Sequence, residues 1–220
     1  IYYLTLNQFP EATTRPNKKG KIPLHYATRE GLIDMVCYLL QANPHSASIQ
    51  TKKKKLPLHF ASGEGRTDIV RALLKAYPDG AKAATQKGKL PLHFASRWGH
   101  LPVAKILLHY HPTAPQHQDL DCSLPLHEAA REGQTAMARY LLQRFPDGAR
   151  QENLRGEIPL FSAVRSGNFQ LVVCLIRAWP LGGKHILDSI HDSDLLQDSW
   201  DWPITNLLLR GAAENFNDCP

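Results

Sequence analysis

The sequence predicts an all-α protein, a solenoid in which short helix-turn-helix units stack in a row and a turn or hairpin loop projects from each unit. Three observations predict it. Proline recurs every 34 residues from Pro23 to Pro159, and in four of the five copies it opens a P-L-H-x-A motif. Glycine follows each of these prolines by eight residues, from Gly31 to Gly167. A second row of prolines, also 34 residues apart, runs from Pro10 to Pro180. A fixed period of this length is typical of repeat proteins, in which each unit buries its apolar face against its neighbours.

Each unit is expected to contain two helices. Proline is favoured in the first turn of a helix because its missing N–H is not needed there, so P-L-H-x-A opens the first helix. The following glycine ends it, because glycine adopts a left-handed conformation without a Cβ clash. A second apolar pattern follows, as in residues 68–78, and it ends at the residue before a proline of the second row.

A tight turn is expected between one unit and the next. Each connecting stretch carries a short polar residue, and glycine stands three positions later in three of the five copies. Such side chains bond their own backbone and favour turns, so they predict the tip of a projecting loop. These residues are Asn17, Thr51, Thr85, Asp119 and Asn153.

The whole arrangement resembles the ankyrin repeat family, whose T-P-L-H-x-A pattern matches "IPLHYA", "LPLHFA" and "LPLHEA" at every residue except the first. The resemblance implies that partners bind along a concave groove, at the loop tips and at the residues just before the glycine. Two departures stand out. The period is 34 residues where the family usually has 33, and we expect the extra residue between the second helix and the turn. The threonine is replaced by Ile or Leu, which predicts the loss of a helix cap worth roughly 1 kcal/mol per repeat.

We expect one domain over residues 1–220. Its five complete repeats span 20–53, 54–87, 88–121, 122–155 and 156–190, and partial repeats lie at 1–19 and 203–220. Residues 181–202 are expected to form an insertion, which carries five aspartates. Solenoids end in polar capping repeats, and neither end of this sequence resembles one, so the chain is expected to continue at both ends.

The composition excludes several classes of protein. A hydrophobic content of 43% with 21% charged residues is typical of a folded chain. The sequence contains no run of about 18 apolar residues and no opening typical of a signal peptide, so no membrane span is predicted. The four cysteines are far apart and form no C-x-x-C pair, which favours neither a zinc finger nor a disulfide scaffold. An intracellular location, cytoplasmic or nuclear, is the resulting expectation.

The sequence predicts no enzyme, no cofactor and no metal site. It contains no phosphate-binding glycine loop, nucleophile elbow or paired-carboxylate motif. Stacked helices lie roughly 8–10 Å apart, whereas zinc needs ligand nitrogens at about 2.0–2.1 Å, so the repeated histidines are interpreted as framework residues that bond backbone. They are His25, His59, His93 and His127. A second cluster is interpreted as solvated surface; it comprises His109, His111, His117 and Asp119.

Charge is distributed unevenly along the chain. The net charge is +6, but residues 1–110 hold 17 Lys and Arg against 6 Asp and Glu, whereas residues 111–220 hold 9 against 14. The first three loop tips read "KKGK", "KKKK" and "QKGK" and carry no acidic residue. If the tips line up along one edge, they form a basic stripe. The predicted partner-binding residues on them are Lys18, Lys19, Lys21, Lys52, Lys53, Lys55, Lys87 and Lys89.

The end of the first helix supplies the other predicted partner-binding residues, Arg29, Arg97, Trp98 and Arg131. Residues 90–99 repeat residues 56–65 except that Arg97 and Trp98 replace Gly63 and Glu64. Trp and Arg often dominate interface energies, so Trp98 is interpreted as an apolar anchor within a basic rim. Because the sister repeat carries Gly63 and Glu64, the framework is expected to tolerate that pair in place of Arg97 and Trp98.

Three functions remain open from the sequence. The first is a protein–protein interaction module or scaffold that presents a basic concave groove to an acidic segment of a partner. The second is recognition of phosphate-rich ligands, nucleic acid or anionic lipid, by the lysine tips, although the acidic second half would repel a long polyanion. The third is a structural spacer, or a groove that the chain's own acidic insertion covers. The sequence does not determine the oligomeric state.

Overall fold

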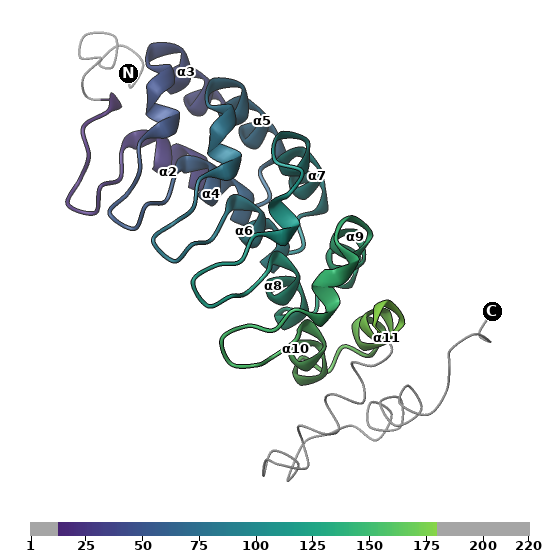
Figure 1. Ribbon diagram of the computed structural model, residues 1–220. Helices are drawn as coiled ribbons and strands as arrows, with labels where there is room; N and C mark the ends of the chain where they lie inside the picture. The colour runs from purple at the N-terminus through teal and green to yellow at the C-terminus, as the bar shows by residue number, and fades with distance from the viewer. Residues whose placement is uncertain (1–12, 180–220) are drawn as a thin grey trace.

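The computed structural model describes residues 13–179, which form two parallel rows of helices with loops projecting at one edge (Figure 1). The first helices of the repeats are α2 (Pro23–Glu30), α4 (Pro57–Gly63), α6 (Pro91–Arg97), α8 (Pro125–Arg131) and α10 (Pro159–Arg165). The second helices are α3 (Ile33–Ala42), α5 (Thr67–Ala76), α7 (Leu101–Tyr110), α9 (Thr135–Arg144) and α11 (Phe169–Ala178). No strand occurs between residues 13 and 179, so the predicted all-α solenoid is confirmed. The partial repeat at 203–220 and the insertion at 181–202 lie outside the described residues.

A short 3-10 helix follows the second helix in four of the repeats. These helices are η2 (Pro44–Ser48), η3 (Pro78–Lys82), η4 (Ala114–Gln116) and η5 (Pro146–Arg150). Each places an alanine in the core, as Ala47 and Ala81 show with exposures of 3% and 2%. The second row of prolines therefore starts a tight turn that packs beneath the neighbouring repeat, in the segment where the extra residue of the 34-residue period is expected.

The residue before each first helix is buried and apolar where the family has threonine. Leu56 has an extended backbone and no side-chain cap, and it is 1% exposed. The same holds for Ile22, Leu90, Leu124 and Ile158, which are 0–1% exposed. Burying a leucine or isoleucine side chain stabilises a fold by about 1.5–3 kcal/mol, which offsets the roughly 1 kcal/mol expected from a missing cap.

The histidine of each P-L-H-x-A motif ties the first helix to the next loop, which confirms the framework role predicted for it. In the second repeat, the backbone N–H of Leu56 donates to Nδ1 of His59 at 3.0 Å. The proton therefore lies on Nε2, which donates to the carbonyl of Ala83 at 3.1 Å. His25, His93 and His127 make the same first bond, and their Nε2 atoms lie 3.1–3.2 Å from the carbonyl oxygen 30 residues later, that of Lys55, Ser123 or Glu157, whereas Ala83 follows His59 by 24 residues. Each ring is at most 1% exposed, so both of its nitrogens are satisfied inside the protein.

The loops between repeats lie side by side and are bonded to one another. In each loop the polar residue predicted to form the turn accepts a backbone bond from the residue three positions later, as Thr85 does from Gly88 at 2.9 Å. Each loop also donates one backbone bond to the loop before it. The donors are Lys52 to Lys19, Gln86 to Lys53, Leu120 to Lys87 and Leu154 to Asp121, at 2.9–3.2 Å. These bonds place the tips along one edge of the stack.

Two of the five turns hold a non-glycine residue in the left-handed conformation. Lys54 has φ 55° and Cys122 has φ 54°, where the other turns have glycine. An L-residue in this region costs roughly 1–2 kcal/mol, whereas glycine adopts it freely.

We predict that Lys54→Gly raises the free energy of unfolding by about 0.5–1 kcal/mol, because it relieves this left-handed strain. Urea denaturation at neutral pH measures the change. Lys53→Gly, one position earlier on the same tip, is the control and should give no gain. Equal effects of the two substitutions would show that the turn holds no strain.

The buried histidines predict a loss of stability in mild acid. Burial lowers the pKa of His25, His59 and His93 to about 4, from 6.5. Between these values the unfolded chain binds more protons than the folded one, so the free energy of unfolding falls as the pH decreases from 6.5 towards 4. The slope is about 1.4 kcal/mol per pH unit for each histidine. His59→Gln should remove one such contribution in urea titrations between pH 5 and 6.5.

Candidate functional site

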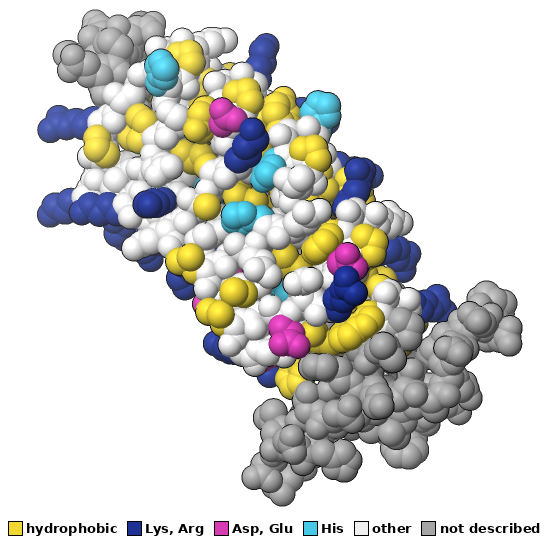
Figure 2. All heavy atoms as spheres, viewed as in Figure 1, with side chains coloured by type: hydrophobic (Ala, Val, Ile, Leu, Met, Phe, Trp, Pro, Cys, Tyr) yellow, Lys and Arg dark blue, Asp and Glu magenta, His cyan; other side chains and the backbone are white. Residues whose placement is uncertain are grey.

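The candidate site is the strip between the projecting loops and the first helices, which we call the loop–helix groove. Two cavities lie in it. The N-terminal cavity, about 440 Å³, is lined by Lys18, Lys19, Lys21, Thr51, Lys52, Lys53, Lys55 and Phe60. The C-terminal cavity, about 370 Å³, is lined by residues of the last two loops, α8 and α10. Figure 2 shows Lys and Arg side chains projecting from the edge where Figure 1 places the first loops.

The N-terminal cavity combines six lysines with an aromatic floor. The ammonium group of Lys21 lies 5.2 Å from the centre of the Phe60 ring, and that of Lys55 lies 4.8 Å from the centre of the Phe94 ring. Within residues 13–179, no ion pair includes any of the six lysines. Burial, together with the positive charges of Lys53 and Lys21, lowers the pKa of Lys55. An anion bound here would remove this unfavourable concentration of charge.

These contacts belong to a regular series. A loop residue of one repeat faces the residue 39 positions later, on the first helix of the next repeat, and we call the two a loop–helix pair. The first two pairs are Lys21 with Phe60 and Lys55 with Phe94. The third is Lys89 with Glu128, and the fourth position holds Ser123 and Ser162. The chemistry of the groove therefore changes between its two halves while the backbone repeats.

The third loop–helix pair is a buried ion cluster. The Glu128 side chain is 2% exposed, and its carboxylate contacts the Lys89 ammonium. Nε of Arg97 lies 3.1 Å from Oε2 of Glu128, and Nη1 of Arg131 lies 3.3 Å from Oε1. Burial alone would raise the pKa of Glu128, but the hydrogen bond and charge of Lys89 and the two arginines hold it below its ordinary value. Lys89 also lies 3.4 Å from Asp119.

The charged residues among the predicted partner-binding residues thus fall into two groups. Lys89, Arg97 and Arg131 are engaged by Glu128, a residue that the sequence reading did not select. Glu128 occupies the variable position of P-L-H-x-A, which is Tyr, Phe, Phe, Glu and Ser in successive repeats. The change from aromatic to acidic at this position could have identified it. The remaining predicted residues make no ion pair within residues 13–179; they are Lys18, Lys19, Lys21, Arg29, Lys52, Lys53, Lys55 and Lys87.

Trp98 is the C-cap of α6 and is 55% exposed. Its neighbour in the previous repeat is Gly63, where an added Cβ would lie 4.0 Å from Cδ1 of Trp98 and 3.7 Å from Cβ of Phe94. Gly63 therefore faces aromatic rings, whereas Arg97 faces a buried carboxylate. The two positions share a register but meet different neighbours.

The sequence predicts neither a catalytic site nor a metal site, and the structure bears on this prediction only for residues 13–179. His117 is used in the framework, since its Nε2 lies 3.0 Å from the carbonyl oxygen of Gly88. No group of three or more His, Cys, Asp and Glu side chains between residues 13 and 179 is arranged to hold a metal ion. None of the helices in that range is both long and apolar enough to cross a membrane.

Comparison with known proteins agrees with the repeat geometry. One ankyrin repeat model, of three copies, matches residues 24–119, and a second, of many copies, matches residues 126–176. The chain belongs to the ankyrin repeat family. No match was found among curated proteins. Ankyrin repeats are in general protein–protein interaction modules and serve as non-catalytic scaffolds.

Because Arg97 pairs with Glu128, replacing Arg97 and Trp98 by the Gly and Glu of the preceding repeat should destabilise the fold. Arg97→Gly should lower the free energy of unfolding by about 1–3 kcal/mol, because it removes a charged partner from a buried carboxylate. Trp98→Glu, at an exposed position, should stay within about 1 kcal/mol of the parent. Urea denaturation of both single variants measures the difference. If Arg97→Gly costs no more than Trp98→Glu, the ion pair does not contribute to the fold.

Proposed function

We propose that this protein is an interaction module whose N-terminal cavity, with the adjoining part of the loop–helix groove, binds an acidic segment of a partner protein. The observation that carries the proposal is the difference between the loop–helix pairs. Lys89 meets a carboxylate supplied by its own chain, whereas the equivalent Lys21 and Lys55 meet phenyl rings and no carboxylate. A partner's Asp or Glu would complete these two pairs as Glu128 completes the third.

The apolar floor favours a segment that also carries hydrophobic residues. Phe60 and Phe94 are partly exposed beneath the lysines. Trp98 lies at the end of α6, the helix that carries Phe94. An apolar side chain packed on these rings would exclude water from the charged contacts, which strengthens them. We propose that Trp98 contacts an apolar side chain of the partner at the C-terminal end of this site. The site ends there because the ion cluster of Glu128 comes next along the groove.

A phosphate-rich ligand, nucleic acid or anionic lipid, is the main alternative. The lysines would suit it, but the basic surface is short. Beyond the third loop, Asp121 and Glu157 line the groove, and they would repel a long polyanion that continued along it. An intracellular site of action, cytoplasmic or nuclear, remains a prediction from the sequence.

We predict that Lys21→Gln combined with Lys55→Gln weakens binding of a seven-residue peptide of alternating Asp and Leu at least tenfold, or about 1.4 kcal/mol. Isothermal titration calorimetry at 150 mM salt measures it. Lys82→Gln is the matched control, because Lys82 is paired with Asp79 on η3, outside the groove.

The same titration separates the alternatives. Random duplex DNA should bind more weakly than the acidic peptide at this salt concentration. Tighter binding of DNA, with an affinity that falls steeply as salt is added, would favour the phosphate-rich ligand instead. An unchanged peptide affinity in the double lysine variant would remove the N-terminal cavity from the site.

A further inference from the structure

The C-terminal cavity lies at the fourth loop–helix pair, which consists of two small side chains. Ser123 and Ser162 stand where the earlier pairs carry a lysine with phenylalanine or glutamate. Both serines line this cavity, which has a volume of about 370 Å³. Sites for small ligands have volumes in this range. The cavity is therefore a local feature of this chain's sequence.

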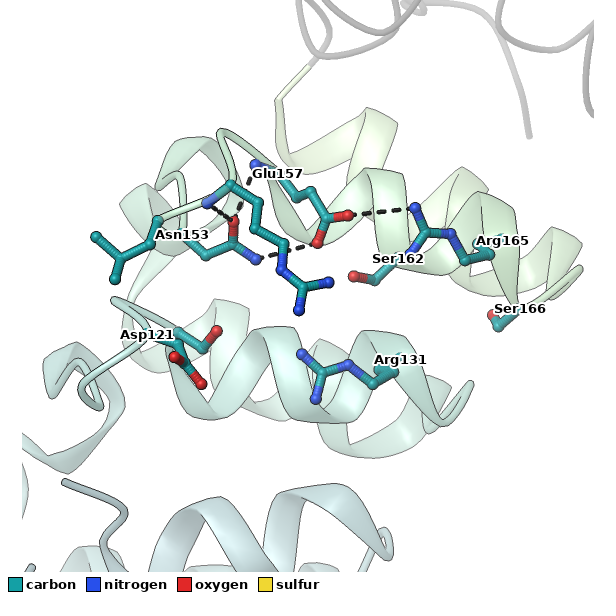
Figure 3. A pocket seen from close by; sticks show the side chains of 10 residues that line it. Asp121, Arg131, Asn153, Glu157, Ser162, Arg165 and Ser166 are labelled. Carbon is teal, nitrogen blue, oxygen red and sulfur yellow. Dashed lines mark hydrogen bonds and ion pairs between the residues drawn. The ribbon is translucent and has the colours of Figure 1, made fainter. Parts of the chain in front are cut away.

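Three arginines from three different segments line this cavity. Arg131 comes from α8, Arg155 from the last loop and Arg165 from α10. Figure 3 shows Arg131 and Arg165 on facing helices, with Ser162 between them on the wall of the cavity. Arginine guanidinium groups are planar forks of N–H donors, which suit anions that accept hydrogen bonds from several directions.

Most of the donor capacity of these arginines is unused. Arg165 contacts Glu157 through Nη2 at 3.2 Å, and Arg131 contacts Glu128 through Nη1 at 3.3 Å. Within residues 13–179, the side chain of Arg155 has no hydrogen bond or ion pair, and neither has the hydroxyl of Ser162. Each guanidinium carries five N–H groups, so several are not used in these contacts.

The acidic residues of the cavity limit what it can hold. Glu157 is already held by Arg165 and by the amide of Asn153, at 3.2 Å each (Figure 3). Asp121 lies exposed on the loop at the rim. These two carboxylates would repel a continuous polyanion that passed along the groove, but a single compact anion can sit between the arginines.

We propose that the C-terminal cavity binds a phosphate monoester, in the form of a phosphorylated serine or threonine side chain on an extended segment of a partner protein. A phosphate has three terminal oxygens and a charge of about −1.5 to −2, so it can accept bonds from three guanidinium groups and a hydroxyl together. A carboxylate has two oxygens and one charge. The proposal does not rest on the lysine cavity, and either site can exist without the other.

The test is an NMR titration of the whole chain with N-acetyl-O-phosphoserine N-methylamide. We expect saturable shifts of the amide and guanidinium signals of Arg131, Arg155 and Arg165. The glutamate analogue and inorganic phosphate, titrated in parallel, should each bind at least tenfold more weakly. Equal affinity for the glutamate analogue would overturn the assignment to phosphate. Equal affinity for inorganic phosphate would overturn the assignment to a phosphorylated side chain.

Two variants test the geometry. Ser162→Phe introduces the residue found at the equivalent positions Phe60 and Phe94, so it should fill the cavity and abolish binding while the remaining amide spectrum is preserved. Arg155→Gln, at an exposed and unpaired position, should weaken binding at least tenfold. Arg150→Gln is the control and should have no effect, because Arg150 is paired with Asp147 on η5, outside the cavity. Undiminished binding in Ser162→Phe or Arg155→Gln would overturn the proposal, whatever the lysine variants do.

Discussion

The fold depends on the histidine bridge in the P-L-H-x-A motif. In the second repeat His59 accepts the N–H of Leu56 and donates to the carbonyl of Ala83, so one buried ring fixes both the start of the first helix and the path of the next loop. An unsatisfied buried polar group costs about 1–3 kcal/mol, so the bridge holds only while both backbone partners keep their positions. The first bond recurs in four repeats, and the second goes to a carbonyl 30 residues later in three of them and 24 residues later from His59. Each loop after the first is also joined to the loop before it by one backbone bond.

A rigid framework of this kind leaves the side chains of the loop–helix pairs free to vary, because the histidines bond loop residues such as Lys55 and Ser123 only through their backbone carbonyls. Lys55 with Phe94, Lys89 with Glu128, and Ser123 with Ser162 occupy one register on nearly the same backbone. The first leaves a cation on an aromatic ring, the second neutralises it, and the third places two hydroxyl groups in the lining of a cavity. The kind of partner group that each part of the groove suits therefore depends on the side chains at two positions per repeat. The backbone of the stack is nearly the same in each repeat.

Most of the fold could be predicted from the sequence, because proline, histidine, leucine and glycine at a fixed period each have a local physical meaning. Contacts across repeats were less accessible. Arg97 and Trp98 differ visibly from Gly63 and Glu64, and this difference alone suggested a partner-facing pair. Only the structure shows that Arg97 meets Glu128, since the two lie on different repeats and an isolated Glu within a helix is ordinary in sequence. The replacement of threonine by Leu56 predicted a lost cap, whereas the burial of Leu56 depends on tertiary packing that the local sequence does not specify.

The ion cluster of Glu128 also explains why the two cavities can act separately. Lys89 and Arg97 are paired with Glu128 and also with Asp119 and Glu132, so their charges are largely compensated between the two cavities. On the N-terminal side the lysines of the first two loops remain uncompensated above aromatic rings. On the C-terminal side the arginines are partly compensated by Glu157 and surround a hollow lined with hydroxyls. A flexible acidic stretch suits the first environment and a single compact dianion suits the second, because three arginines from separate segments line one cavity there.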